Sequence, residues 1–78
     1  MEGWEYKTDW GSFAIVAVGG GGSWSIVFDG ESLGFYPTPE AALAGLVGGA
    51  CVQPRGSPPT DEIGLPDDLS AWEPIRGR

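Results

Sequence analysis

Residues 33–49 read LGFYPTPEAALAGLVGG, and this stretch decides the fold. Thr38 carries a hydroxyl that can cap a helix N-terminus, and Pro39 suits the first helical position. Glu40 places a negative charge beside the positive end of the helix dipole. These three residues predict a helix that begins at residue 38.

The predicted helix continues to residue 48 and has one apolar side. Leu43, Leu46 and Val47 follow the i, i+3, i+4 spacing that places side chains on one stripe of a helix. Two glycines at residues 48–49 predict its end, because glycine readily adopts the conformations that close a helix. Gly45 costs stability inside a helix, so we expect it to permit close packing against a sheet.

The residues before this helix predict antiparallel strands. Residues 4–8 alternate between charged side chains and aromatic or β-branched ones, which is the period of a strand. Residues 9–12 predict a turn, and residues 13–18 (FAIVAV) form the most strongly β-branched run in the chain. We expect the glycines of residues 19–22 to connect this run to a hairpin partner at residues 24–28.

A second hairpin is predicted around the aspartate–glycine pair at residues 29–30. This pair favours a type I′ turn, in which both central residues have positive φ. Residues 31–36 are then the returning strand, with Leu33 and Phe35 expected on the same face. Gly34 in the middle of the strand indicates a bulge or a close backbone approach.

The residues after the helix predict less regular structure. We expect residues 50–52 to form a short edge strand, and residues 53–60, with three prolines, to form a loop. Residues 61–78 are an acidic tail in which residues 65–72 resemble a short helical turn with a proline near its start. The residues of this turn expected to dock on the core are Leu65, Leu69 and Trp72.

These elements predict a small α+β fold in one domain over residues 1–78. The sheet, within residues 4–36, has three to four antiparallel strands, and the helix of residues 38–48 packs on one face of it. A chain of 78 residues buries only about 60% of the surface that its unfolded form exposes, so the expected core is small.

The charge balance excludes several classes of partner. Eleven acidic residues against four basic ones give a net charge of −7. Direct nucleic-acid binding and attachment to anionic membranes both depend on basic surfaces, so neither is expected. No basic, apolar leader and no membrane-length apolar run is present, which predicts a cytoplasmic protein.

The residue types needed for most catalysis are missing. The chain has no histidine and a single cysteine, Cys51, so it contains no Ser-His-Asp, Cys-His or zinc site. We expect Cys51 to be a small buried thiol. A carboxylate pair acting on a sugar would need a substrate cleft, which a chain this small rarely encloses beside a core. We therefore expect no enzymatic activity, no cofactor and no metal.

Binding to another protein is the remaining class of function. An acidic surface can occupy a basic groove in place of nucleic-acid phosphates, and its charge speeds the encounter. The aromatic residues that would add contact energy where exposed are Trp4, Tyr6, Trp10 and Tyr36. The acidic residues predicted to bind the partner are Asp29, Glu31, Glu40, Asp61, Glu62, Asp67, Asp68 and Glu73.

The run LGFYPTPEAALAGLVGG, followed by a proline-containing loop and by IGLPDDLSAW at residues 63–72, resembles small acidic proteins of proteobacterial phages and mobile elements. The resemblance covers residues 24–72. Such proteins include anti-CRISPR inhibitors, which bind a nucleic-acid-handling complex stoichiometrically. The resemblance therefore implies an inhibitor, with a subunit of a type I CRISPR surveillance complex as the first expected partner. It carries no residue-level motif, so it assigns no binding residue.

A second function class stays open at this point. Val16, Val18 and Val27 fall on the sheet face opposite Ile15 and Ile26, so that face is not cleanly polar. A homodimer would hide it. The first hypothesis is thus an inhibitor, which can be a monomer. The alternative is a structural or interaction module that forms a homodimer through an uncovered sheet face.

Overall fold

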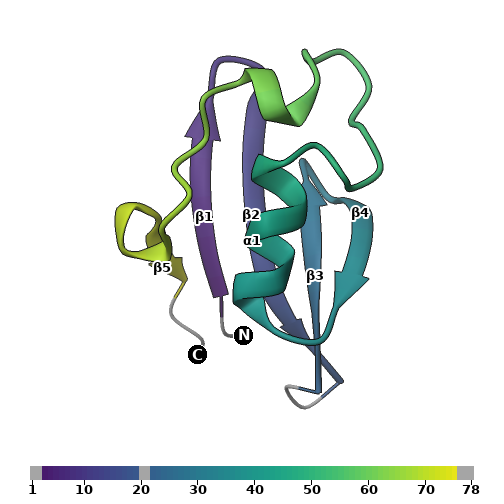
Figure 1. The fold of residues 1–78 in the computed structure, drawn as a ribbon, viewed down its shortest axis with the longest axis vertical. Helices are drawn as coiled ribbons and strands as arrows, with labels where there is room; N and C mark the ends of the chain where they lie inside the picture. Colours follow the sequence, from purple (N-terminus) through teal and green to yellow (C-terminus); the bar gives the residue numbers. More distant parts are fainter. Residues whose placement is uncertain (1–2, 20–21, 76–78) are drawn as a thin grey trace.

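The computed structural model describes residues 3–19 and 22–75, and in them it confirms the predicted α+β class (Figure 1). The helix α1 spans Pro39–Val47, and two short 3-10 turns, η2 and η3, span Thr60–Glu62 and Leu69–Ala71. The strands are β1 (Gly3–Thr8), β2 (Gly11–Val18), β3 (Ser23–Phe28), β4 (Glu31–Tyr36) and β5 (Glu73–Ile75). Parts of the predicted glycine loop (20–21) and acidic tail (76–78), and residues 1–2 of the predicted domain, lie outside the described residues.

All neighbouring strands of the sheet are antiparallel, in the order β4-β3-β2-β1-β5. The first four strands follow one another as hairpins, and the chain returns to add β5 beside β1. The sheet therefore has one strand more than the three to four predicted. Strand β5 has only three residues and contains Pro74, so no alternating pattern marks it in the sequence. An edge strand tolerates this proline, which has no backbone donor.

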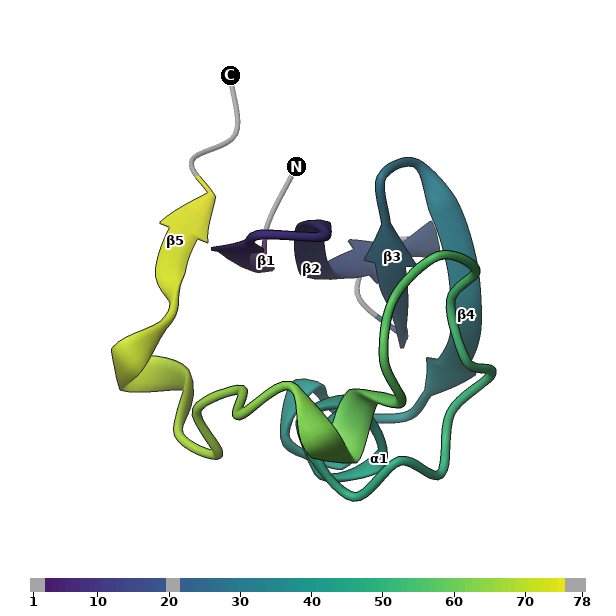
Figure 2. The same ribbon diagram turned by 90° about the horizontal axis from the view of Figure 1, so that it is seen from above.

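The molecule has two layers. In Figure 2 the helix α1, η2 and the segment that follows η2 lie on one side of β1, β2 and β3. The helix contacts β2, β3 and β4 and also η2. We call the sheet face that α1 covers the inner face, and the opposite one the outer face. In the described part of the chain, no element covers the outer face (Figure 2).

The turn between β3 and β4 is bonded to the start of β2, next to the turn between β1 and β2. Asp29 and Gly30 have φ values of 48° and 88°, which confirms the predicted type I′ turn. The Asp29 carboxylate accepts a hydrogen bond from the Ser12 backbone N–H at 2.9 Å. The other predicted turn, at residues 9–12, is shorter than expected. Gly11 and Ser12 already belong to β2, where they pair with Thr8 and Lys7 of β1.

A bulge in β4 changes which side chains face the core. The register shifts between Ile26 and Val27 of β3, so that Leu33 is an extra residue, and Gly34 has a φ of 146°. The predicted bulge at Gly34 is confirmed. The expectation that Leu33 and Phe35 share a face is wrong, since the extra residue interrupts the alternation. Leu33 is buried, whereas Phe35 lies opposite Ser25 on the outer face and is 66% exposed.

The helix has the capping residues that the sequence predicts. The Thr38 hydroxyl accepts a hydrogen bond from the Ala41 N–H at 3.0 Å, and Pro39 is the first helical residue. Gly48 closes the helix at its other end. The backbone N–H groups of Ala50 and Cys51 both turn back to the Gly45 carbonyl.

This closure explains why the predicted edge strand at residues 50–52 is wrong. Ala50 and Cys51 use their donors to end the helix, so they cannot pair with β4. The segment keeps one hydrogen bond to the sheet, from the Val52 N–H to the Leu33 carbonyl at 3.1 Å. Cys51 is a buried free thiol, as expected, and its Sγ lies 3.8 Å from the Thr60 Oγ1.

The core lies between the inner face of the sheet, the helix and the tail. Phe13 and Phe28 meet across β2 and β3 with ring centroids 4.6 Å apart. Leu65 and Trp72 of the tail are both buried in the same cluster, which confirms their predicted docking, while Leu69 packs against it half-buried. The predicted helical turn is shorter than residues 65–72, because η3 begins at Leu69.

We predict that Leu46→Ala lowers the free energy of unfolding by about 2–5 kcal/mol, because Leu46 is fully buried and the helix can collapse only partly into the cavity. Chemical denaturation followed by tryptophan fluorescence measures this. Val52→Ala is the control: Val52 is 65% exposed, so its replacement should change stability by less than about 0.5 kcal/mol. Equal effects of the two substitutions would contradict the assignment of the core.

Gly45 provides a second test of the packing. A Cβ built at Gly45 would lie 2.7 Å from the Tyr36 Oη and 2.9 Å from its Cζ. Glycine-to-alanine changes inside a helix normally stabilise by about 1 kcal/mol. Here we predict that Gly45→Ala destabilises by about 1–3 kcal/mol, because the tyrosine ring has to move. The penalty should shrink when Tyr36→Leu is also present, and a stabilising Gly45→Ala would show that the contact is loose.

Candidate docking groove

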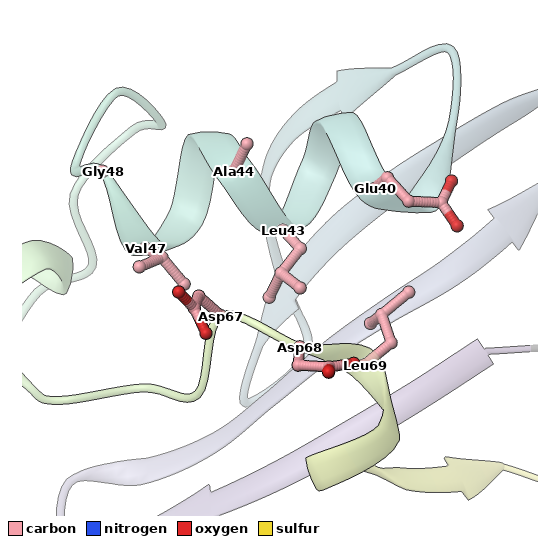
Figure 3. A pocket seen from close by; sticks show the side chains of 8 residues that line it. All are labelled: Glu40, Leu43, Ala44, Val47, Gly48, Asp67, Asp68 and Leu69. Atoms are coloured by element: carbon pink, nitrogen blue, oxygen red, sulfur yellow. The ribbon is translucent and has the colours of Figure 1, made fainter.

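A groove of about 570 Å³ runs between helix α1 and the segment that precedes η3 (Figure 3). Its helical wall comes from one side of α1, and its opposite wall comes from residues 67–69. Its lining residues are Glu40, Leu43, Ala44, Val47, Gly48, Asp67, Asp68 and Leu69.

The helical wall combines apolar side chains with short ones. Leu43 and Val47 are one helical turn apart, so their side chains follow one another along the groove. Ala44 and Gly48 fill little volume beside them, which leaves the groove open above the helix backbone. Figure 3 shows Leu43 directed across the groove toward Leu69. The floor of the groove is therefore aliphatic.

The opposite wall is held in place by the tail. The indole N–H of Trp72 donates a hydrogen bond to the Pro66 carbonyl at 3.0 Å, directly before Asp67. Leu65 is buried in the core on the other side of this proline. Asp68 is the N-cap of η3 and accepts a hydrogen bond from the Ser70 N–H at 2.9 Å. The wall is thus an anchored segment of irregular backbone.

The groove carries only one sign of charge. Three of its eight lining residues are acidic and none is basic. In Figure 3 the Asp67 carboxylate lies beside Val47, Asp68 lies near Leu69, and Glu40 extends outward at the other end of the helix. All three are exposed, so their field reaches solvent and is screened by salt. The Ser70 backbone N–H, which bonds to the Asp68 carboxylate, and then the Ser70 side chain hold the pKa of Asp68 below its ordinary value.

The other five predicted acidic residues lie elsewhere. Asp29 bonds to the neighbouring turn, and Glu31 pairs with Phe28 at the start of β4. Asp61 and Glu62 are in η2, where Asp61 lies against Gly49 beyond the helix end. Glu73 faces Glu5 across β5 and β1. The structure thus brings three of the eight predicted acids into one groove and leaves the rest apart from it.

Most of the predicted aromatic contacts are structural. Trp4 stacks near Trp24 with centroids 5.8 Å apart, and Tyr6 stacks near Trp72 at 5.6 Å. Both pairs pack in or against the core, and so does Tyr36. Trp10, in the first tight turn, is 45% exposed and helps to line a smaller hollow of about 290 Å³ on the β1 side. Of the four aromatic residues, Trp10 is the one best placed to meet a partner.

Sequence reasoning missed the aliphatic floor of the groove. Leu43, Val47 and Leu69 were expected to be core residues, and Leu43 is indeed buried in that core. The available signal was the width of the apolar stripe on α1, together with the short side chains at Ala44 and Gly48. That signal does not show that residues 67–69 leave a gap beside the helix, because the position of the tail depends on tertiary contacts.

The described residues contain no group of three or more histidine, cysteine, aspartate or glutamate side chains placed to hold a metal ion. Within the same residues no helix has the length and hydropathy needed to cross a membrane. Comparisons of the chain with protein-family profiles, curated protein sequences and solved structures found no match.

The lowered pKa of Asp68 has a consequence for stability. A carboxyl with a depressed folded-state pKa stabilises the fold above its unfolded value of about 3.9, and this contribution is lost as the pH falls through the folded value. We predict that Asp68→Asn keeps the cap but makes unfolding less pH-dependent below about pH 4. Ser70→Ala should raise the pKa of Asp68 part of the way, as measured by NMR titration. An Asp68 pKa at its ordinary value would contradict the capping geometry.

Proposed function

We propose that this protein is a stoichiometric inhibitor that binds a basic, amphipathic segment of a partner protein in the groove between α1 and residues 67–69. One observation carries the proposal: the groove has an aliphatic floor and an acidic rim without a basic residue. Such a surface suits a segment whose apolar side chains enter the floor while its Lys or Arg side chains reach Glu40, Asp67 and Asp68.

The two parts of the groove have different roles in this proposal. Apolar burial in the floor contributes to affinity, but the floor has room for a few side chains only and part of the gain offsets the entropy lost on association. The exposed carboxylates mainly speed association and orient the partner. The two basic residues of the described part, Lys7 and Arg55, do not line the groove and do not neutralise its rim. Binding should therefore be both salt-sensitive and dependent on the aliphatic floor.

Proteins that handle nucleic acid present the kind of basic surface that this groove fits. Together with the resemblance of residues 24–72 to phage and mobile-element inhibitors, this makes a type I CRISPR surveillance complex the first target to test. Inhibition would consist of occupying a nucleic-acid-binding surface in the cytoplasm of a bacterial host. It needs no catalytic step, no cofactor and no contact of this chain with nucleic acid.

The proposal predicts that charge reversal weakens binding only in the groove. Asp67→Lys and Glu40→Lys should each raise the dissociation constant for the type I complex about tenfold or more at roughly 50 mM salt. Glu62→Lys and Glu73→Lys make the same change of net charge outside the groove and should have effects within about twofold. Biolayer interferometry with immobilised inhibitor measures all four.

The aliphatic floor is tested separately. Val47→Thr keeps the shape of the side chain but replaces one methyl by a hydroxyl, and it should weaken binding at high and low salt alike. Equal effects from all four charge reversals would mean that only net charge matters and that the groove is not the site. Failure of wild-type protein to bind any type I complex at low salt would remove that target.

A further inference from the structure

The outer face of the sheet has a distinct composition over β2, β3 and β4. The register places Phe13, Ile15, Ile26 and Phe28 on the inner face, so the alternate residues face outward. Nine residues of these three strands lie on the outer face, and none of them is charged. Four are serines, and the others are Ala14, Val16, Val18, Val27 and Phe35. We call these nine residues the neutral patch.

The neutral patch exposes apolar side chains and hides part of its polar ones. Phe35 is 66% exposed and Val18 is 37% exposed. Ser25 lies between Val16 and Phe35 in the register and is only 3% exposed. Its hydroxyl is 3.0 Å from that of Ser32, so these two groups satisfy each other. The patch therefore offers solvent an uncharged surface on which Phe35 and Val18 are the exposed large apolar side chains.

Charged residues occupy the other half of the outer face. Glu5 and Lys7 of β1 point outward there, and Glu73 of β5 lies directly opposite Glu5. The outer face is thus divided along the boundary between β1 and β2. Its neutral half belongs to the β2–β3–β4 side of the sheet.

We propose that a second copy of this chain packs on the neutral patch. Two copies with a net charge of −7 repel each other wherever their carboxylates meet. The neutral patch has no carboxylate of its own, so two copies can meet on it with carboxylates only at its border, where Asp29 bonds to Ser12. A two-fold dimer brings the same surface of both copies together, and an uncharged sheet face brings no like charges together in such a contact. The two sheets would pack about 10 Å apart, with each Phe35 covered by the other copy.

The size of the patch sets the expected strength of this dimer. Three strands about 4.8 Å apart, with residues spaced by about 3.3 Å, give a face of roughly 15 by 20 Å. Its area is well below the roughly 800 Å² per partner of a standard interface. We therefore expect a weak, reversible dimer with a dissociation constant on the order of 100 µM.

The dimer would place the two docking grooves on opposite outer sides. The groove lies in the helical layer, and the neutral patch lies on the far face of the sheet (Figure 2). Dimerisation leaves both grooves open. A partner that displays its basic segment in repeated copies would then be bound at two points, which raises the overall affinity without any new contact. The dimer itself does not depend on the function proposed for the groove.

Sedimentation velocity from about 20 µM to about 2 mM protein tests the proposal, since this range brackets the expected dissociation constant. The mean mass should rise from 8.2 kDa toward twice that value. Phe35→Asp should raise the dissociation constant at least about a hundredfold, because each dimer loses two apolar anchors. Val52→Asp adds the same charge at an equally exposed site outside the patch, so it should retain the dimer.

Salt and a second variant complete the test. Dimerisation should hold or strengthen between roughly 50 and 300 mM salt because screening reduces the repulsion, whereas binding in the groove should weaken. Asp67→Lys should leave the dimer intact. Circular dichroism checks the fold of Phe35→Asp, and if it unfolds, Val18→Asp replaces it on the same patch. A monomer at 2 mM, or Val52→Asp disrupting the dimer as strongly as Phe35→Asp, would overturn the proposal.

Discussion

The structure depends on one mismatch of size between its two layers. Helix α1 runs along the strands (Figure 1), so across them it covers only its own diameter of about 10 Å, whereas five strands side by side span about 20 Å. A single short helix therefore cannot cover the inner face of this sheet. Leu65 and Trp72 of the tail complete the cover, and β5 fixes the end of the tail to the edge of the sheet.

The docking groove follows from this way of completing the core. A tail whose only helical parts are two short 3-10 turns cannot pack along a helix as another helix would, because it lacks a continuous apolar stripe. It descends into the core at Leu65 and at Trp72, and between these points Asp67 and Asp68 remain in solvent. The seam between α1 and the tail thus combines the edge of an apolar core with exposed carboxylates. A surface of this kind suits recognition of a basic, amphipathic segment better than an acidic surface without an aliphatic floor.

Local chemistry made much of the fold predictable. The Thr38 cap, the aspartate–glycine turn and the bulge at Gly34 depend on neighbours in sequence, and all three are confirmed. The rest depends on distant contacts. Strand β5 exists because β1 offers it an edge, and the groove exists because Trp72 bonds to Pro66 at a particular place beside the helix. Charge alone grouped eight acids as one surface, but only their positions in the fold show that three of them share a groove.

The two faces of the molecule differ in charge. The helical layer carries the acidic rim of the groove, whereas the nine residues of the neutral patch are uncharged. No basic residue of the described part of the chain lines the groove, so its carboxylates would attract a cationic partner over about a Debye length. The same charges oppose self-association everywhere except on the neutral patch, where Phe35 is exposed because the bulge at Gly34 turned it away from the core. An insertion of one residue in β4 thus determines both the burial of Leu33 and the apolar character of the far face. A chain of this size has a small core and few large apolar side chains. The exposure of Phe35 on an uncharged sheet face therefore favours the interpretation that this face contacts another molecule.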